Sequence, residues 1–262
     1  SALQRDAALS GRYTHAVESG RREGEAMTGE APVALVTGGT GQVGSVVVRY
    51  FAERGTRVFV PYRTAAHWEA LRASLGPLAE AVAGAQLDLA VAEEAERAVA
   101  GAIERWGKLD WVLCLAGGYR AGRIAETDRA LWDELLAMNL WPTANVLRAA
   151  LPRLLERGTG RVVTVGARAA LDPGAGSVAY AAVKQAVMTL TLAVAREARG
   201  TGVTVNCIAP ATIDTPANRE AMPKADHSKW VPREQVAALL WFLCSPEAAA
   251  LNGAIIPLAG GQ

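Results

Sequence analysis

The sequence predicts an α/β fold: a single domain built on a doubly wound parallel sheet of about seven strands, with helices on both faces. Short runs rich in β-branched residues alternate with amphipathic stretches from Pro32 to the end of the chain. Strands so apolar are buried on both faces, and their alternation with helices is typical of parallel sheets. The 262 residues, 51% of them hydrophobic, are enough for one large core.

The expected elements alternate without an internal repeat. The strands are predicted at 33–36, 57–60, 86–87, 109–115, 161–165, 203–208 and 254–257. The helices are predicted at 43–54, 65–74, 91–105, 128–156, 179–199 and 233–244. This order is that of a Rossmann-like domain, which we place at 31–262. Residues 210–232 follow the sixth strand without a predicted element, so we expect them to form a lid over a ligand.

Residues 1–30 differ in composition from this domain. They are rich in Arg, Glu, Ser and Gly, show no apolar period and begin without Met. Such a stretch cannot bury enough apolar surface to fold by itself. We expect a flexible N-terminal extension, either a remnant of cloning or a segment upstream of Met27.

The charge balance favours a small-molecule partner. The 27 Lys and Arg residues almost cancel the 26 Asp and Glu residues, so no strong field attracts nucleic acid or an anionic membrane. No uninterrupted apolar run reaches about 18 residues, and no secretory signal precedes the first strand. We expect a cytoplasmic protein that binds neither nucleic acid nor membrane.

The cysteines and histidines predict neither a disulfide framework nor a metal site. The three cysteines are odd in number and far apart, which does not fit paired or metal-binding spacings. The three histidines have no carboxylate cluster near them. The residues concerned are Cys114, Cys207, Cys244, His15, His67 and His227.

A glycine-rich turn directly follows the first strand. Residues 37–44 read Thr-Gly-Gly-Thr-Gly-Gln-Val-Gly and contain the pattern G-x-G-x-x-G. Glycines permit a tight turn and close approach of a pyrophosphate, and the following helix presents free N–H groups. The place of the turn between first strand and first helix favours a dinucleotide site over a plain glycine-rich connection. Its candidate cofactor-binding residues are Gly38, Gly39, Thr40, Gly41, Gln42, Val43 and Gly44.

The end of the second strand indicates which dinucleotide binds. A site selective for NAD places Asp or Glu there, whereas this sequence reads Val60-Pro61-Tyr62-Arg63-Thr64. Arg63 is suited to a 2′-phosphate, so NADP(H) is preferred over NAD(H). The alternative is that Arg63 is only an exposed arginine that opens a helix.

Tyr180 and Lys184 form a candidate catalytic pair. They stand four residues apart, on one face of the helix predicted at 179–199. An ammonium near a phenol favours the phenolate, which brings the ordinary pKa of about 10 toward working pH and makes the phenol a usable proton donor. The pattern Y-x-x-x-K is common, but here it follows the fifth strand of a chain that carries the glycine turn.

These motifs together resemble the short-chain dehydrogenase/reductase family, from Pro32 to Gln262. The resemblance implies an NAD(P)-dependent oxidoreductase in which Tyr180 donates the proton and Asn139 supports a relay through Lys184. It also implies a place beside the adenine for Asp88 and Leu89. The remaining implied cofactor contacts are Ala116, Gly117 and Gly118 after the fourth strand, and Pro210, Ile213 and Thr215 near the nicotinamide.

The sequence departs from the family pattern at several positions. Gln42 stands where many members have a glycine, Cys114-Leu115 replaces an asparagine pair, and Ala211 replaces a glycine. The usual catalytic serine, thirteen residues before the tyrosine, corresponds to Ala167. Loss of an oxyanion donor costs about 3–4 kcal/mol in comparable sites. Ser177 is the alternative source of that hydroxyl.

Three segments resemble the dihydropteridine reductase subfamily: 114–119, 166–172 and 213–230. That subfamily also lacks the serine, and its quinonoid substrate takes hydride into a conjugated ring without forming a tetrahedral alkoxide. The resemblance places Tyr119, Ala167 and Trp230 beside the substrate, with Tyr119 stacked on a flat ring. Alternatively, Tyr119 and Trp230 only cover the pocket mouth. The subfamily carries an acidic residue after the second strand and favours NADH, which Arg63 does not match.

Two other functions stay open at this point. One is a carbonyl reductase or alcohol dehydrogenase in which another group replaces the serine. The other is a non-catalytic dinucleotide sensor, against which the retained Tyr180, Lys184 and Asn139 argue. Because the helices at 128–156 and 179–199 are more apolar than one sheet face requires, we also expect a homodimer or homotetramer.

Overall fold

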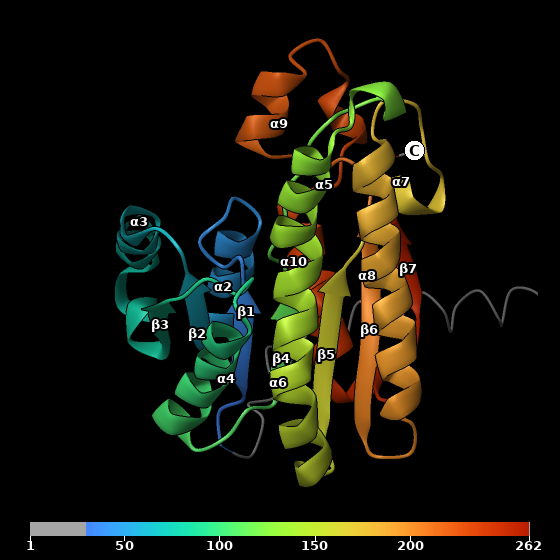
Figure 1. The fold of residues 1–262 in the computed structure, drawn as a ribbon. Coiled ribbons are helices and arrows are strands. Elements are labelled where there is room, and N and C mark those ends of the chain that lie inside the picture. Colours follow the sequence, from blue (N-terminus) through green and yellow to red (C-terminus); the bar gives the residue numbers. More distant parts are fainter. Residues whose placement is uncertain (1–29, 262) are drawn as a thin grey trace, which may run out of the picture. The chain divides into compact units, whose positions relative to one another are not determined.

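The structure, a computed structural model, describes residues 30–261, so the prediction for the N-terminal extension falls outside the described residues except at its last position. The described chain forms a seven-stranded sheet in which each neighbouring pair of strands is parallel (Figure 1). This confirms the predicted fold class. The strands, in the order β3-β2-β1-β4-β5-β6-β7, are β1 (Val33–Thr37), β2 (Arg57–Tyr62), β3 (Val82–Gln86), β4 (Trp111–Cys114), β5 (Gly160–Val165), β6 (Val203–Pro210) and β7 (Ile255–Leu258).

The order of the strands reverses between β1 and β4. From β1 the chain winds outward to β2 and β3, then returns to the other side of β1 with β4 and continues to β7. Thr37 and Cys114 are partners at the carboxyl ends of β1 and β4. Open α/β sheets bind ligands at such a reversal, so the architecture places a site beyond these two strand ends.

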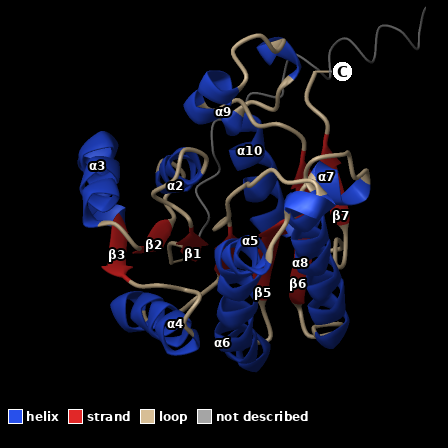
Figure 2. Ribbon diagram, turned by 45° about the horizontal axis from the view of Figure 1, so that its top comes forward, coloured by secondary structure: helices blue, strands red, loops and turns tan. Residues whose placement is uncertain are grey.

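Helices cover both faces of the sheet (Figure 2). One apolar core packs α4 (Ala92–Trp106), α6 (Trp141–Arg157) and α8 (Val178–Glu197) against the strands. A second core packs α2 (Gly44–Ala52), α3 (Ala65–Leu75) and α10 (Arg233–Cys244) on the other face. Three short helices complete the chain: α5 (Arg129–Leu135), α7 (Arg168–Leu171) and α9 (Pro216–Ala221).

By length and hydropathy, α8 would qualify as a membrane-crossing helix, as one helix does among the residues described. Half of its apolar window is buried inside the protein, and it contacts β6, α7 and β5. A core helix of a parallel sheet passes the same test because it too is apolar over its whole length.

The third strand and the long helix at 128–156 differ from the prediction. The strand spans Val82–Gln86 rather than 86–87. Its residues are small because the strand packs closely: a Cβ on Gly84 would lie 2.5 Å from the Val60 carbonyl oxygen and 2.9 Å from Trp68. A run of Ala and Gly does not show the β-branched pattern by which the other strands were predicted. The helix is divided by the π-helical turn η3 (Leu136–Leu140), which separates α5 from α6. An apolar period does not reveal such a change of hydrogen bonding.

Phe51 joins three elements in the second core. Its fully buried ring meets Trp111 of β4 and Trp241 of α10 edge-on, at centroid distances of 5.8 and 5.2 Å. We expect Phe51→Ala to lower the free energy of unfolding by about 3–5 kcal/mol, measured by urea denaturation. Phe242→Ala is the control: that ring is 43% exposed on α10, and its loss should cost within about 0.5 kcal/mol. Equal losses in the two variants would contradict this account of the core.

Candidate active site

The glycine turn joins the end of β1 to the start of α2. Gly38 has a φ of +64°, and the Gly41 N–H donates to its carbonyl oxygen at 2.9 Å. A Cβ on Gly44 would lie 2.1 Å from that same oxygen, so a side chain there would force the turn open. The Ser45 N–H in the first turn of α2 donates to the Gly41 carbonyl oxygen at 2.9 Å, so the start of the helix is tied to the glycine turn. An N–H at the very start of the helix, such as that of Gly44, has no acceptor within the helix itself.

A cavity of about 640 Å³ lies against this turn and the ends of β2, β3 and β4. It fits a dinucleotide, since the turn supplies backbone donors for a diphosphate and glycines where a Cβ would obstruct it. The predicted site residues that line it are Gly38, Thr40, Gly41, Gln42, Val43, Gly44, Arg63, Asp88, Leu89, Ala116 and Gly117.

Sequence reasoning missed nine other residues of the cavity wall. Five of them lie within two residues of predicted positions at strand ends, where proximity was the available signal. The others come from α3, η3 and the start of α6, and no motif marked them. The nine are Pro61, Tyr62, Thr64, His67, Leu87, Leu115, Ala137, Met138 and Pro142.

The β2 end of the cavity carries an exposed cation. The Tyr62 ring stacks on Trp68, with centroids 5.0 Å apart and an interplanar angle of 4°. The Arg63 backbone oxygen accepts from Gln86 Nε2 at 3.0 Å, while its guanidinium has no hydrogen-bond or ion-pair partner within residues 30–261. Arg63 is thus fixed through its backbone and free to bind an anion through its side chain.

Lys184 lies beneath the carboxyl end of the sheet. It is buried, and its Nζ donates to the Val165 carbonyl oxygen at 2.9 Å. Burial lowers the pKa of Lys184 to about 8, and the nearby Cys207 opposes that shift. A Cβ on Gly117 would come within 3.1 Å of this Nζ, so the segment after β4 passes directly over the ammonium.

Asn139 holds that segment in place. It sits fully buried in η3, where its Nδ2 donates to the carbonyl oxygens of Gly118 and Leu135 and its Oδ1 accepts from the Gly118 N–H. The amide therefore fixes Gly118 by two hydrogen bonds, at 3.1 and 3.2 Å. A π-helical turn at this position is common at functional sites.

Tyr180 opens α8, half-buried beside Tyr119. The two rings meet edge-on, with centroids 4.9 Å apart and an interplanar angle of 80°. Burial raises the pKa of Tyr180 to about 12, and Tyr119 raises it further. The expectation of a lowered pKa is therefore wrong for the protein by itself: Lys184 makes its hydrogen bond to Val165 and is itself partly deprotonated near neutral to alkaline pH.

Ser177, the alternative source of the hydroxyl that is missing at Ala167, lies on a different element from Ala167. Ala167 is buried at the start of α7, whereas Ser177 precedes α8 and bridges Gly122 through its backbone. Tyr119, 55% exposed, stands on the open side of Tyr180. None of Tyr119, Ala167 and Ser177 lines the 640 Å³ cavity.

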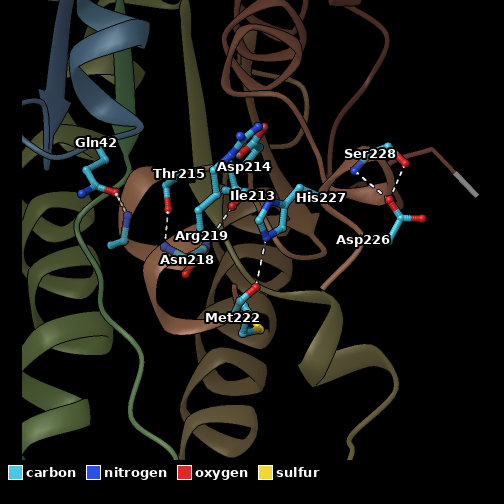
Figure 3. Close-up of polar contacts among 11 residues, drawn as sticks. Gln42, Ile213, Asp214, Thr215, Asn218, Arg219, Met222, Asp226, His227 and Ser228 are labelled. Carbon is cyan, nitrogen blue, oxygen red and sulfur yellow. Dashed lines mark hydrogen bonds and ion pairs between the residues drawn. The ribbon is translucent and has the colours of Figure 1, made fainter. Parts of the chain in front are cut away.

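The segment 210–232 contains more structure than the sequence predicted. It forms α9 and a 3₁₀ turn at His227–Lys229 (Figure 3). Thr215 caps α9 by accepting from the Asn218 N–H at 3.2 Å. Trp230 is buried against His227, with ring centroids 4.3 Å apart. Several predicted residues do not line the cavity. Gly39 faces Val48 and Val60 inside the protein; Gly118, Asn139, Tyr180 and Lys184 form the layer beyond β4 that we call the catalytic layer; and Pro210, Ile213, Thr215 and Trp230 belong to the segment 210–232.

Comparisons with known proteins agree with this arrangement. A family model described as short chain dehydrogenase matches residues 32–226. Dehydrogenase/reductase SDR family member 4 of Bos taurus is 31% identical over 241 residues, which cover 88% of this chain and 86% of that protein. D-threitol dehydrogenase of Mycolicibacterium smegmatis is 32% identical over 241 residues, with coverage of 88% and 93%.

A solved structure of actinorhodin polyketide ketoreductase with NADPH has a TM-score of 0.82 to this chain at 28% identity, covering 88% of this chain and 97% of that one. A structure of ElxO with NADP bound has the same TM-score at 21% identity, which is a likeness of fold. These relatives support carbonyl and alcohol chemistry, and they do not single out the dihydropteridine reductase subfamily that the sequence analysis favoured.

The lowered pKa of Lys184 predicts how turnover depends on pH. A lowered pKa means that the ammonium is lost at a lower pH than in a free lysine, here at about 8. Because the ammonium supports proton donation by Tyr180, kcat/KM for reduction should fall as the pH rises through this value. The measurement is a profile of kcat/KM from pH 6 to 10 with a saturating cofactor.

Two variants serve as controls for that profile. Lys184→Met should be roughly 10²-fold slower and should lack the inflection, while Tyr180→Phe should lose most turnover at every pH. An inflection that survives in Lys184→Met would show that another group titrates.

Proposed function

The chain belongs to the short-chain dehydrogenase/reductase family and is an NAD(P)-dependent oxidoreductase of its carbonyl and alcohol type; from that premise we propose that it uses NADP(H) to reduce a conjugated, quinonoid compound. The observation that carries the proposal is Ala167, which is buried where the family places a hydroxyl donor. A dihydropteridine of quinonoid form is the named substrate that fits, by the resemblance in segments 114–119, 166–172 and 213–230.

In this proposal, different residues of the chain bind the cofactor, donate the proton and stabilise the phenolate. The glycine turn and the first N–H groups of α2 bind the diphosphate, while Gly117 and Gly118 are kept in position by Asn139. The reduced nicotinamide, when bound, supplies hydride. Tyr180 Oη holds the proton that the reduced product needs, and the Lys184 ammonium below it stabilises the phenolate left behind.

Ala167 decides between substrate classes because of where charge develops. Hydride addition to a simple ketone leaves a localised oxyanion, which needs a second donor beside the tyrosine. A quinonoid acceptor spreads the new electron pair over a conjugated ring and needs only the proton donor.

The surface around Tyr180 suits a flat apolar substrate. Tyr119 meets Tyr180 edge-on and is 55% exposed, so one face of its ring is available for stacking. Two further large apolar side chains are exposed on segments that contact the start of α8 or the helix itself: Ile124, two residues after the bridge between Gly122 and Ser177, and Leu171 in α7, are 68% and 46% exposed. We propose that they belong to the same ligand-binding surface.

The second candidate is reduction of an ordinary ketone or oxidation of an alcohol. It is favoured by the relatives, which include a D-threitol dehydrogenase and a polyketide ketoreductase. On this alternative Ser177, three residues before Tyr180, would supply the missing hydroxyl from the start of α8.

NADP(H) is the proposed cofactor because of Arg63. Its guanidinium lies exposed at the cavity wall after β2, a position from which it can meet a 2′-phosphate. We expect Arg63→Ala to weaken NADPH binding roughly tenfold and to leave NADH binding within about twofold, since a charged hydrogen bond contributes about 1.5–3 kcal/mol. Fluorescence titration of both dinucleotides measures this. Equal weakening of the two would leave Arg63 without a role in selectivity.

Ala167→Ser separates the two candidate functions. If the substrate is quinonoid, the new hydroxyl meets no localised oxyanion, and turnover should stay the same or fall. If the substrate is a ketone, the restored donor should raise kcat by roughly 10- to 100-fold. The assay follows NADPH oxidation with quinonoid dihydropterin and with a ketone panel, using wild type and variant side by side.

A ketone-specific gain without dihydropterin activity in either protein would overturn the quinonoid proposal. Ketone turnover that is undiminished in Ser177→Ala would exclude the ketone mechanism that depends on that hydroxyl.

A further inference from the structure

The outer part of the segment 210–232 makes almost all its hydrogen bonds within itself. Asp214 pairs with Arg219 by two hydrogen bonds, at 2.6 and 2.7 Å, and Asn218 Nδ2 donates to the Ile213 carbonyl oxygen at 2.8 Å. The His227 ring contacts the Met222 carbonyl oxygen at 3.0 Å. Figure 3 shows these contacts and how closely the segment folds on itself.

Both ends of the segment are held to one another by backbone pairing. The Asp214 N–H donates to the Val231 carbonyl oxygen at 2.8 Å, and the Val231 N–H donates to that of Thr212 at 2.9 Å. Between these ends, residues 216–229 are mostly exposed. This is the arrangement of a flap on a narrow base, and near that base Ser228 and Lys229 lie against Gly260 and Gly261. The position of α9 beside the glycine turn therefore depends on the contacts that α9 itself makes.

Within residues 30–261, one hydrogen bond links 216–229 to a residue outside the segment. The Ala217 N–H donates to Gln42 Oε1 at 3.2 Å, across a sequence separation of 175 residues (Figure 3). Ala217 is in the first turn of α9, where an N–H has no acceptor within the helix. Gln42 therefore caps α9 from the other side of the cleft, beside the cap that Thr215 provides locally.

Gln42 is itself firmly placed. It belongs to the glycine turn and lines the cavity, and its backbone oxygen accepts from Arg233 Nη1 at 3.3 Å at the start of α10. Its side-chain Nε2 has no hydrogen-bond partner in the described part of the chain, so the amide has one oxygen on the flap and two N–H groups left over. Many family members have a glycine at this position and have no side chain to make such a link.

We propose that Gln42 is a positioning residue that fastens the flap 216–229 to the phosphate-binding turn and offers its free Nε2 to the dinucleotide diphosphate. The Gln42 amide then contacts the diphosphate through Nε2 and the Ala217 N–H through Oε1. Binding of the diphosphate fixes the amide, and the fixed amide holds α9 closed over the cofactor. The second half of this inference rests on the proposed function, and the first half does not.

Three variants separate these roles. Gln42→Leu keeps the size of the side chain but removes both the acceptor and the donor. Gln42→Glu keeps an oxygen for the Ala217 N–H, and its charge suits a helix N-terminus, but it replaces the donor with a carboxylate. Glu220→Gln is the control, because it changes an exposed side chain on α9 that has no hydrogen bond or ion pair among the residues that the structure describes, and it leaves the link to Gln42 intact.

Hydrogen exchange of the peptide 216–222, without any dinucleotide, tests the fastening. In Gln42→Leu it should be about three- to tenfold faster than in wild type, the range expected for loss of one neutral hydrogen bond. In Gln42→Glu it should match wild type or be slower. Exchange in Gln42→Leu equal to wild type, or equal acceleration in Glu220→Gln and Gln42→Leu, would overturn the proposal.

Binding of NADPH, measured by fluorescence titration and stopped-flow dissociation, tests the contact with the diphosphate. Dissociation should be about three- to tenfold faster from Gln42→Leu, and affinity should fall further in Gln42→Glu because the carboxylate repels the phosphates. Gln42→Glu binding as tightly as wild type would remove the diphosphate contact from the proposal. If neither NADPH nor NADH binds wild type, the proposed function fails, while the exchange experiment still decides whether Gln42 fastens the flap.

Discussion

The close approach of Gly44 to the Gly38 carbonyl oxygen is the constraint on which the site depends. A Cβ on Gly44 would lie 2.1 Å from that oxygen, so the turn can close and α2 can begin directly above β1 only without a side chain. The closed turn forms one wall of the cavity. Through Thr37, whose Oγ1 accepts from the Ala116 N–H at 3.0 Å, it also fixes the start of the segment that leads to the catalytic layer. One backbone contact thus sets both halves of the site.

The catalytic layer also depends on a glycine at a point where the backbone packs too closely for a side chain. Gly117 lies between Asn139 and Lys184, since a Cβ there would come within 2.8 Å of one side chain and 3.1 Å of the other. Asn139 uses its amide on Gly118, and Lys184 uses its Nζ on Val165. Two buried polar groups are thereby satisfied by backbone, which keeps their cost low and their geometry fixed. A bound substrate meets groups that need little rearrangement.

The sequence predicted what local patterns encode and missed what depends on tertiary contact. The glycine turn, the pair Tyr180 and Lys184 and six of the seven strands were visible, because their residue types are required by the backbone or by burial on both faces. The strand at 82–86 was displaced because an edge strand under Trp68 is built of small residues. The predicted direction of the Tyr180 pKa shift is wrong because burial and the neighbouring Tyr119, which a sequence does not display, both raise that pKa.

Two of the departures from the family pattern, at positions 42 and 167, have opposite effects on the hydrogen bonds of the site. Ala167 removes a hydrogen bond to the reacting group, which lowers the stabilisation that the protein offers to a localised charge. Gln42 adds a hydrogen bond between the phosphate turn and the flap, which favours a closed cleft. Closure excludes water and strengthens each remaining electrostatic interaction, the Lys184 ammonium with the Tyr180 phenolate above all. A site that gives up an oxyanion donor and gains a fastening is suited to a substrate that must be enclosed and protonated.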